Sequence, residues 1–355
     1  MTTHKIAVIR GDGIGIEVVE EGIKVLKAVS QHFDYDLEFT EFPWSSEYYK
    51  KYGEMMPSDG IDILSKFQAI FLGAVGHPDI QDHVTLNGLL LPIRRKFDQY
   101  VCERPSVLYP GIVSPLSNKN EYDIDMVVIR ENTEGEYANV GGFQYLDFPE
   151  EIGIQTGVFT RKGCERVIRY AFELAIKRNK KNHVTSITKS NAQGYGMIVW
   201  DRAFENISKE FPNINTDSLL VDAAAMDFIR KPETFDVVVG SNLFGDILTD
   251  IGAIITGSMG LASSANLDPE NRYPSMFEPV HGSAPDIMGK GIANPMAQIL
   301  TGAMMLRHLG HDDAATLIEN SIIKILESGN CLTPDLGGTC SAEQVGNAAV
   351  ASLGK

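Results

Sequence analysis

Residues 6–26 read IAVIRGDGIGIEVVEEGIKVL, which is an apolar run, three closely spaced glycines and an amphipathic segment. The run at 6–9 predicts a buried strand. The glycines at 11, 13 and 15 predict a tight turn in which the backbone comes close to a neighbouring group. Beyond the turn, apolar positions recur with the period of a helix: Val18, Val19, Ile23 and Leu26.

The glycine spacing differs from that of the usual dinucleotide-binding fingerprint. That fingerprint is G-x-G-x-x-G after a strand, whereas residues 11–15 carry G-x-G-x-G, so the third glycine comes one residue early. The strand-to-helix turn is retained. We therefore predict an α/β protein whose first glycine turn is not a regular Rossmann fingerprint.

The same alternation of strand-like and helix-like segments continues along the chain. Apolar runs include KIAVI, QAIFLGAV, DMVVIR, HVTSITK, DSLLVD and FDVVVGSN. Predicted helices cover 16–30, 163–178, 197–210, 294–308 and 313–328, with Gly329 ending the last of these and Ser341 opening a final helix. This pattern predicts helices covering a largely parallel sheet. The glycine-rich stretch at 138–157 breaks the rhythm and predicts a protruding β arm or a loop.

Composition narrows the class of protein. The chain has 355 residues, 43% of them apolar and 22% charged, as expected for one large or two ordinary globular domains. A net charge of −16 disfavours nucleic acid and anionic membranes as partners. No run approaches the roughly 20 apolar residues of a membrane span, and no signal core is visible, so the cytosol is the expected location. The four cysteines form no C-x-x-C pair, which predicts reduced structural thiols.

Three arginines are predicted near strand or helix ends. Arg94 and Arg104 bracket a helix end, and Arg130 ends the strand DMVVIR. Guanidinium groups bind carboxylates through two hydrogen bonds, so three of them at the carboxyl edge of a sheet suggest a di-acid ligand. Ordinary ion pairs between elements are the alternative.

A set of acidic residues has the spacing of a metal site. Asp246 and Asp250 lie four residues apart, on one face of a predicted helix, and Asp222 follows the run SLLV. Three carboxylates at one place repel unless a hard cation such as Mg²⁺ or Mn²⁺ joins them. The alternative is a helix start with acids favoured by the helix dipole, which fits Asp246 better than Asp250.

Two further residues have side chains suited to proton transfer. Lys189 closes the strand HVTSIT and is a candidate base, and Tyr137 in RENTEGEY is a candidate proton donor. A solvated lysine and a half-buried packing tyrosine are the alternatives.

The segment FEPVHGSAPDIMGKGIANPMAQIL, residues 277–300, predicts a tight, exposed loop rich in glycine and proline. Such loops hold ligands through main-chain groups. Asp286 in it is suited to accept both ribose hydroxyls of adenosine and to repel a 2′-phosphate. A turn-rich connection is the alternative.

Together and in this order, these segments resemble the β-decarboxylating dehydrogenase family, which includes isopropylmalate, isocitrate, tartrate and D-malate dehydrogenases. The most specific strings are NLFGDILTD and EPVHGSAPDIMGKGIANP, and the likeness extends from GDGIG to at least His308. It implies an isopropylmalate/isocitrate dehydrogenase-like fold, in which two α/β domains share a large central sheet. Residues 1–102 and 257–355 would form the larger, NAD-binding domain. Residues 103–256 would form a smaller dimerisation and substrate domain with an arm near 138–157.

The resemblance also implies roles for the candidate residues. The malate-like part of a 2-hydroxy di-acid would be held by Arg94, Arg104 and Arg130. The metal ion, Mg²⁺ or Mn²⁺, would be bound by Asp222, Asp246 and Asp250. Lys189 would remove the hydroxyl proton, directly or through water, while hydride passes to NAD⁺. Tyr137 would protonate the carbon left after CO₂ departs. K⁺ is an expected activator.

Cofactor contacts follow from the same likeness. Asn191 would lie near the nicotinamide, and the remaining cofactor residues would be Gly73, His281, Gly282, Ser283, Ala284, Asp286 and Asn294. Family members are homodimers with shared active sites, so Lys189 and Asp222 would reach across from the partner chain. An acidic residue at 286 favours NAD over NADP.

The substrate is the least determined feature. RENTEGEY, KSNAQGYGMIVWD and FPWSSEYY most resemble tartrate and D-malate dehydrogenases. At the position that reads the variable substituent, isopropylmalate enzymes carry an acid and this chain carries Asn87, which suits a hydroxyl or no substituent. Leu90 and Leu91 are able to line an apolar pocket, so 3-isopropylmalate dehydrogenase stays an alternative. A catalytically silent homologue is another.

The assignment of Asp286 can be tested by charge reversal. Asp286→Lys is expected to lower the ratio of kcat/KM with NAD⁺ to kcat/KM with NADP⁺ by about tenfold or more, because a lysine attracts the 2′-phosphate. Asp313→Lys makes the same change in net charge outside the loop and serves as the control. An unaltered cofactor ratio in Asp286→Lys means that another residue reads the ribose.

Overall fold

The computed structural model describes residues 2–354, which divide into two compact units. The larger unit contains the residues up to 99, 103–124 and those from 252 onward; the smaller contains 100–102 and 125–251. The segment 103–124 therefore belongs to the larger unit, although we expected it in the smaller domain. Contacts with later residues explain this: Ser114 Oγ donates to the carbonyl of Ile255, and Gly111 lies directly against the carbonyl of Leu326.

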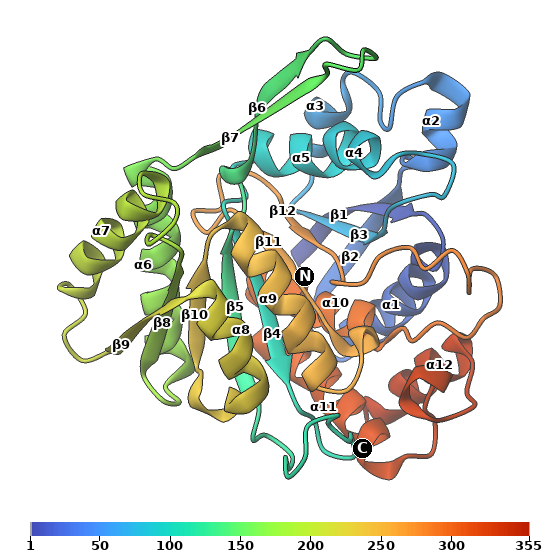
Figure 1. Cartoon of the computed structure of the whole chain (residues 1–355). Helices are drawn as coiled ribbons and strands as arrows, with labels where there is room; N and C mark the ends of the chain where they lie inside the picture. The colour runs from blue at the N-terminus through green and yellow to red at the C-terminus, as the bar shows by residue number, and fades with distance from the viewer. Residues whose placement is uncertain (1, 355) are drawn as a thin grey trace. The chain divides into compact units, whose positions relative to one another are not determined.

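The larger unit is an α/β structure whose strands follow the order β2-β1-β3-β12-β11-β4 (Figure 1). Pairing is parallel among β2, β1, β3 and β12 and antiparallel between β12 and β11, so this part of the sheet is mixed. Its strands are β1 (Thr2–Gly11), β2 (Tyr35–Glu41), β3 (Ala69–Ala74), β4 (Val101–Val107), β11 (Ala265–Leu267) and β12 (Ser275–Phe277). The first two residues of β4 are assigned to the smaller unit.

Helices cover this sheet, and α1 packs on both α10 and α12. The helices are α1 (Gly15–Ser30), α2 (Ser46–Tyr52), α3 (Gly60–Leu64), α4 (Asp82–Thr85), α5 (Leu91–Lys96), α10 (Met296–His308), α11 (Asp312–Ser328) and α12 (Ala342–Ser352). Shorter turns are a π-helical turn η1 (Leu86–Leu90) and the 3₁₀ turns η3 (Met259–Leu261) and η4 (Pro334–Leu336). Gly329 ends α11 in the left-handed conformation, and Ser341 opens α12 with a capping box, both as predicted.

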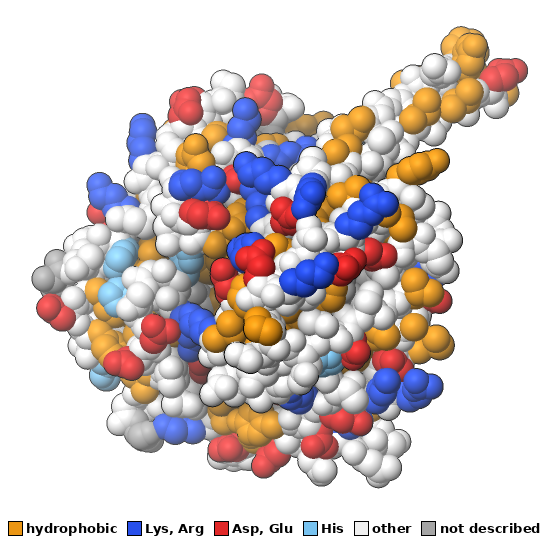
Figure 2. All heavy atoms as spheres, turned by 90° about the vertical axis from the view of Figure 1, so that its left-hand side faces the viewer, with side chains coloured by type: hydrophobic (Ala, Val, Ile, Leu, Met, Phe, Trp, Pro, Cys, Tyr) orange, Lys and Arg blue, Asp and Glu red, His pale blue; other side chains and the backbone are white. Residues whose placement is uncertain are grey.

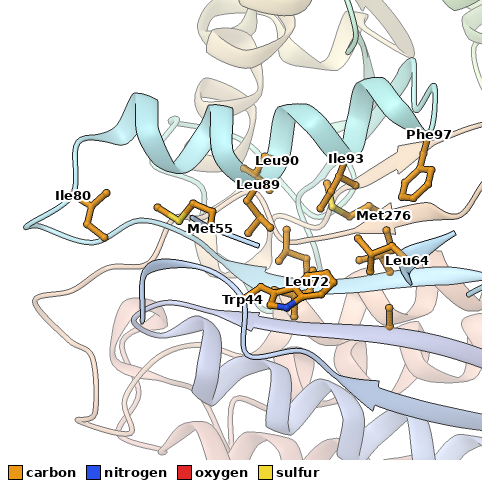
Figure 3. Packing of buried hydrophobic residues seen from close by; sticks show 13 residues of the cluster. Trp44, Met55, Leu64, Leu72, Ile80, Leu89, Leu90, Ile93, Phe97 and Met276 are labelled. Atoms are coloured by element: carbon orange, nitrogen blue, oxygen red, sulfur yellow. The ribbon is translucent and has the colours of Figure 1, made fainter. Parts of the chain in front are cut away.

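One side of this sheet packs on a large apolar cluster (Figure 3). Trp44, Met55 and Leu72 lie in it together with side chains from η1 and α5. Leu90 is one of these buried side chains. Leu90 therefore packs in the core, and its predicted contact with the substrate stays a prediction.

The glycine turn that follows β1 is held by a buried carboxylate. Asp12 accepts hydrogen bonds from the hydroxyls of Ser45 and Ser46, both at 2.7 Å, and from the amide of Gly76 at 2.8 Å. The amide of Ile14 donates to the carbonyl of Ser283 at 2.8 Å. The turn thus contacts a segment about 270 residues later in the chain. This close contact between two backbones explains why glycines, which have no Cβ, occupy the turn.

The smaller unit contains four parallel strands in the order β5-β10-β8-β9. They are β5 (Asp125–Glu131), β8 (His183–Thr188), β9 (Asn215–Leu220) and β10 (Val237–Gly240). The helices are α6 (Arg161–Arg178), α7 (Gly196–Ser208), α8 (Val221–Arg230) and α9 (Asn242–Ile255), with a 3₁₀ turn η2 (Pro232–Thr234); the last four residues of α9 fall in the larger unit. Helices α6 and α7 pack together against this sheet (Figure 1).

The stretch predicted as an arm or loop forms a separate antiparallel pair, β6 (Gly135–Gln144) and β7 (Ile152–Val158). Its far end is the narrow extension at the upper right of Figure 2, where hydrophobic side chains are exposed. These are Val140, Phe143, Tyr145, Leu146, Phe148, Ile152 and Ile154. A pair of two strands has little hydrophobic core of its own, and exposed apolar patches mark interaction sites. The arm is therefore a candidate binding surface for another protein chain.

None of the helices within residues 2–354 has the length and apolar character needed to cross a membrane.

The close approach of the glycine turn predicts a large effect of one added methyl group. Gly13 has a φ of 55°, and a Cβ there would lie 2.0 Å from the Ser283 carbonyl oxygen. Gly13→Ala is expected to destabilise the protein by roughly 2–4 kcal/mol in chemical unfolding. Gly53 has a similar positive φ but open space around it, so Gly53→Ala is the control and should lose about 1 kcal/mol. Equal losses would contradict the contact.

Candidate active site

Three predicted site residues of the smaller unit, and a fourth polar residue that was not predicted, lie at the carboxyl edge of its parallel strands. Arg130 lies at the end of β5, Lys189 follows β8, Asp222 follows β9, and Asn242 opens the helix after β10. Parallel α/β sheets bind ligands at this edge. The strand order places the ends of β5 and β10 together and those of β8 and β9 together.

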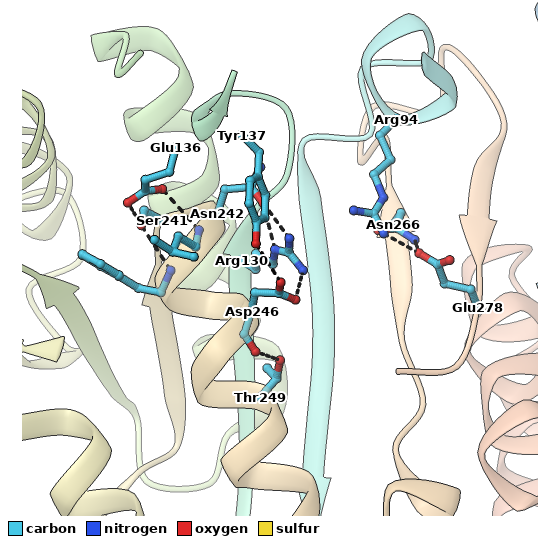
Figure 4. A network of polar contacts seen from close by, with 12 residues as sticks. Arg94, Arg130, Glu136, Tyr137, Ser241, Asn242, Asp246, Thr249, Asn266 and Glu278 are labelled. Atoms are coloured by element: carbon cyan, nitrogen blue, oxygen red, sulfur yellow. Dashed lines mark hydrogen bonds and ion pairs between the residues drawn. The ribbon is translucent and has the colours of Figure 1, made fainter. Parts of the chain in front are cut away.

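The first pair of strands builds a cluster around the carboxylate of Asp246 (Figure 4). One oxygen of Asp246 accepts from Nη1 of Arg130, and the other accepts from the hydroxyl of Tyr137 at 3.1 Å. Arg130 also donates through Nε and Nη2 to the side-chain oxygen of Asn242, at 3.0 and 2.7 Å. The guanidinium lies 5.4 Å from the Tyr137 ring centre, so its charge also interacts with the ring.

Neighbouring residues fix this cluster from behind. Glu136 accepts from the hydroxyl of Ser241 at 2.8 Å and from the amide of Leu243 at 3.2 Å, which ties the arm strand β6 to the start of α9. A Cβ on Gly245 would lie 2.6 Å from the Cβ of Arg130, so only glycine allows the helix to lie this close. Neither Asn242 nor Glu136 was predicted as a site residue, although they lie in the strings NLFGDILTD and RENTEGEY.

Tyr137 is suited to hold a proton at neutral pH. Burial of the phenol, and next the negative charge of Asp246, raise the pKa of Tyr137 above its usual value. A phenol with a raised pKa stays protonated and remains a donor.

The second pair of strands builds an ion pair between Lys189 and Asp222. Lys189 Nζ lies 2.5 Å from Asp222 Oδ1, and the hydrogen bond to the lysine lowers the pKa of the aspartate. Asp222 is largely exposed, whereas Lys189 is half-buried. The exposed end of the pair is open to another molecule.

The structure does not bring the three predicted metal ligands together in one chain. Asp246 and Asp250 lie one turn apart on α9, but Asp222 follows β9, which is two strands away from β10. Two strand spacings amount to about 10 Å, too far for one cation to reach both ends. Within residues 2–354 no group of three acidic, histidine or cysteine side chains is placed to hold a metal ion.

In the larger unit, Arg94 is buried and ion-paired. Its Nη2 lies 2.6 Å from Oε1 of Glu278, an oxygen that also accepts from Asn266 Nδ2 at 2.7 Å (Figure 4). Its Nε is buried without a hydrogen-bond partner. Arg104, on β4, is buried too. The sequence left open that the arginines form ordinary ion pairs between elements. Arg94 does form such a pair, with Glu278.

Asn87 lies in the π-helical turn η1 and is exposed, with its side-chain amide donating to the carbonyl of His83 at 2.8 Å. The π turn adds a residue to the helical register. This turn leaves Asn87 at the surface, while Leu89 and Leu90 point into the core.

The loop after β12 has the character of a ligand-binding segment. The Nε2 atom of His281 is buried without a partner, and burial lowers the pKa of this imidazole, so it is neutral and open to a hydrogen bond. Gly282, Gly289 and Gly291 face open space where a side chain would go. Ala284 takes a φ of 38°, an uncommon conformation for a residue with a Cβ.

The other predicted cofactor residues have varied surroundings. Ser283 is buried against the glycine turn, and Asp286 is exposed. The side chain of Asn294 donates to Asp335 at 3.0 Å. Asn191 is exposed in the turn after Lys189. Gly73 is buried, and a Cβ there would lie 2.3 Å from the Arg10 carbonyl, so close packing of β3 accounts for this glycine.

Comparison with known proteins places these features in a family context. The sequence matches the family described as isocitrate/isopropylmalate dehydrogenase over residues 5–350. A probable tartrate dehydrogenase/decarboxylase of Agrobacterium vitis is 51% identical over 346 residues, covering 97% of this chain and 96% of that protein. The D-malate dehydrogenase (decarboxylating) of Escherichia coli strain K12 is 49% identical over 354 residues, covering 98% of each.

A solved structure agrees with the sequence match. The isocitrate dehydrogenase from Methylococcus capsulatus superposes with a TM-score of 0.89 at 35% identity, covering 99% of this chain and all of the other. The predicted α/β fold of this family is therefore confirmed. Its sheet is mixed because β11 and β12 pair antiparallel, whereas the sequence predicted a largely parallel sheet.

A buried acid next to Arg130 predicts how stability changes with pH. Burial raises the pKa of Glu131 to about 7, although three hydrogen bonds from Thr133 and Glu134 oppose the shift. The unfolded chain ionises this group at lower pH, so the buried acid destabilises the fold progressively as pH rises toward 7. Glu131→Gln removes the effect. The difference in free energy of unfolding, Glu131→Gln minus wild type, should therefore increase by roughly 1–3 kcal/mol as the pH rises from 4.5 to 8.

Thermal unfolding at several pH values measures this change. Glu150→Gln alters an exposed arm residue and should follow the wild type at every pH. A pH-independent difference between Glu131→Gln and wild type would show that Glu131 is ionised in the folded protein throughout this range.

Proposed function

The chain belongs to the isocitrate/isopropylmalate dehydrogenase family, and we propose that it is an NAD- and metal-dependent dehydrogenase that oxidises and decarboxylates D-malate or tartrate. The family match supports the reaction class. The choice of substrate rests on relatives at about half identity over nearly the full chain, whose names specify tartrate and D-malate.

One observation carries the catalytic part of the proposal. The carboxylate of Asp246 is contacted at once by the guanidinium of Arg130 and by the phenol of Tyr137. An anion-binding group, a proton donor and a candidate metal ligand thus lie within one hydrogen-bonded cluster. A merely structural network has no need of a half-buried phenol aimed at an accessible carboxylate.

The residues fit a divalent cation and a dinucleotide. Asp246 and Asp250 offer oxygen atoms from one helix face, the donors that Mg²⁺ and Mn²⁺ prefer, and the unpartnered Nε2 of His281 offers a contact to NAD. When bound, the cation polarises the hydroxyl and carboxylate oxygens of the substrate, and NAD⁺ accepts the hydride.

The chain's own residues perform the remaining steps. The arginines hold the two substrate carboxylates and orient the carbon that is oxidised. Lys189 takes the proton from the hydroxyl, directly or through one water, as hydride leaves the same carbon. Loss of CO₂ from the carboxylate of the resulting β-keto acid leaves the electron pair on an enolate. Tyr137 then transfers its phenolic proton to the carbon that lost CO₂, and the keto acid product forms.

We further propose a homodimer in which each active site uses both chains. Asp222 is too far along the sheet to join Asp246 within one chain, so the partner's Lys189–Asp222 pair would complete the site. Exposed apolar residues supply an interface: those of the β6–β7 arm, and Met226 and Ile229 on α8 with Ile247 and Ile254 on α9. Their spacing puts each helical pair on one face, and exposed faces of this kind mark interfaces.

A substrate panel tests the function. In steady-state assays with NAD⁺, Mn²⁺ and K⁺, D-malate or tartrate should give the highest kcat/KM. A kcat/KM for 3-isopropylmalate at least about tenfold above that for D-malate would assign the protein to leucine synthesis instead. No NADH from any of the three di-acids would indicate a catalytically silent homologue.

The metal assignment predicts the behaviour of Asp250→Asn. Loss of one anionic ligand should raise the Mn²⁺ concentration for half-maximal activity by about tenfold or more, with a smaller effect on KM for NAD⁺. Asp313→Asn, at the start of α11, is the control. The rise in thermal midpoint on adding Mn²⁺ should also shrink. Unchanged metal dependence would remove Asp250 from the site.

A further inference from the structure

Two cysteines that the proposed reaction does not use lie in direct contact. The Sγ atoms of Cys331 and Cys340 are 2.7 Å apart, and both are free thiols. Neither is fully buried, in contrast to Cys102 and Cys164. A disulfide requires about 2.05 Å between the sulfurs, so only a small movement separates this pair from a bond.

The two thiols close a tight loop, residues 331–340. The amide of Cys340 donates to the carbonyl of Leu332 at 2.9 Å, and the amide of Gly338 donates to the carbonyl of Thr333 at 3.0 Å. A Cβ on Gly338 would lie 2.0 Å from the Leu332 carbonyl oxygen. The backbone is therefore already folded back on itself in the form that a bridge needs.

This loop supports the predicted cofactor segment. Asp335, at its tip, accepts from the side chain of Asn294 at 3.0 Å and from the hydroxyl of Ser258 at 2.5 Å. Just beyond the loop, the amide of Ala342 donates to the carbonyl of Gly291 at 2.9 Å. The position of the cysteine loop thus bears directly on two residues of the 281–294 segment.

We infer that Cys331 and Cys340 form a reversible disulfide, an oxidation-sensitive clasp that holds the Asp335 loop against the NAD-binding segment. Its effect on NAD rests on the proposed function. Because the thiols already touch, the bridge preserves the geometry of the loop and restricts its motion. The oxidised protein is accordingly the form better organised to bind NAD⁺.

The chemistry balances with a peroxide as oxidant. One thiol is oxidised to a sulfenic acid by hydrogen peroxide, which is reduced to water. The second thiol attacks that sulfur, the S–S bond forms and a second water leaves. A small-molecule thiol reverses the step by exchange and is itself oxidised to a disulfide.

The surroundings of the pair affect the rate. Burial, followed by the neighbouring thiol, raises the pKa of Cys331 to about 12, so this sulfur is held as the thiol at neutral pH. Thiolates are the reactive form, so we expect oxidation to be slow at pH 7 and to accelerate as pH rises.

Peptide mapping of the full chain tests whether the bond forms. Trypsin releases residues 325–355 as one peptide that holds both cysteines, because no lysine or arginine lies between Lys324 and Lys355. After treatment with hydrogen peroxide, this peptide should be lighter by two hydrogen atoms and resist alkylation until dithiothreitol is added. Two alkyl groups on the peptide after this treatment would overturn the inference.

Calorimetry with NAD⁺ and Mn²⁺ tests the consequence. Oxidised wild type should melt several degrees higher than the reduced protein and bind NAD⁺ about twofold to fivefold tighter. Cys340→Ser and Cys331→Ser should keep the reduced affinity and show neither change on oxidation. Equal affinity in the two redox states of wild type, with the bond present, would overturn the clasp. Bond formation and the higher midpoint without any NAD⁺ binding would support the disulfide and count against the proposed function.

Discussion

The carboxylate of Asp246 is the group on which the candidate site depends, because two functional side chains take their positions from it. Arg130 and Tyr137 come from nearby parts of the chain, and helix α9 brings this acid to both of them. Gly245 permits that approach, and Glu136 holds the helix start in place. Replacing Asp246 would remove a carboxylate from a buried guanidinium, and the loss of one partner from a buried ion pair is costly for any fold.

The order of the parallel strands separates the candidate site residues of the smaller unit into two groups. Neighbouring strands β5 and β10 give one polar cluster, and β8 and β9 give the Lys189–Asp222 pair. The same sheet edge thus carries two polar clusters, each on its own pair of strands. In the proposed homodimer, a second copy would present its Lys189–Asp222 pair to the Asp246 cluster, and the exposed apolar arm and helix faces would give that copy a place to bind.

Local patterns in the sequence predicted the helix faces and helix ends of the structure. The features that depend on contacts between distant segments could not be predicted in this way. Helix period placed Asp246 and Asp250 on one face, and cap residues placed the ends of α11 and α12. The sequence did not reveal that the glycine turn binds the carbonyl of Ser283, because such a contact leaves no local pattern. Nor did it reveal that a π turn rotates Leu90 into the core. Segment 103–124 was misplaced because its partners lie near Ile255 and Leu326.

Complementation between two damaged chains tests the shared site most directly. Lys189→Ala and Tyr137→Phe should each inactivate a homodimer, because every site then lacks one group. In a mixed dimer isolated through two different tags, one site combines both defects and the other is intact. If each site takes residues from both chains, the mixed dimer should retain about half of the wild-type turnover on D-malate. A mixed dimer as inactive as its parents would show that each chain supplies both residues to its own site.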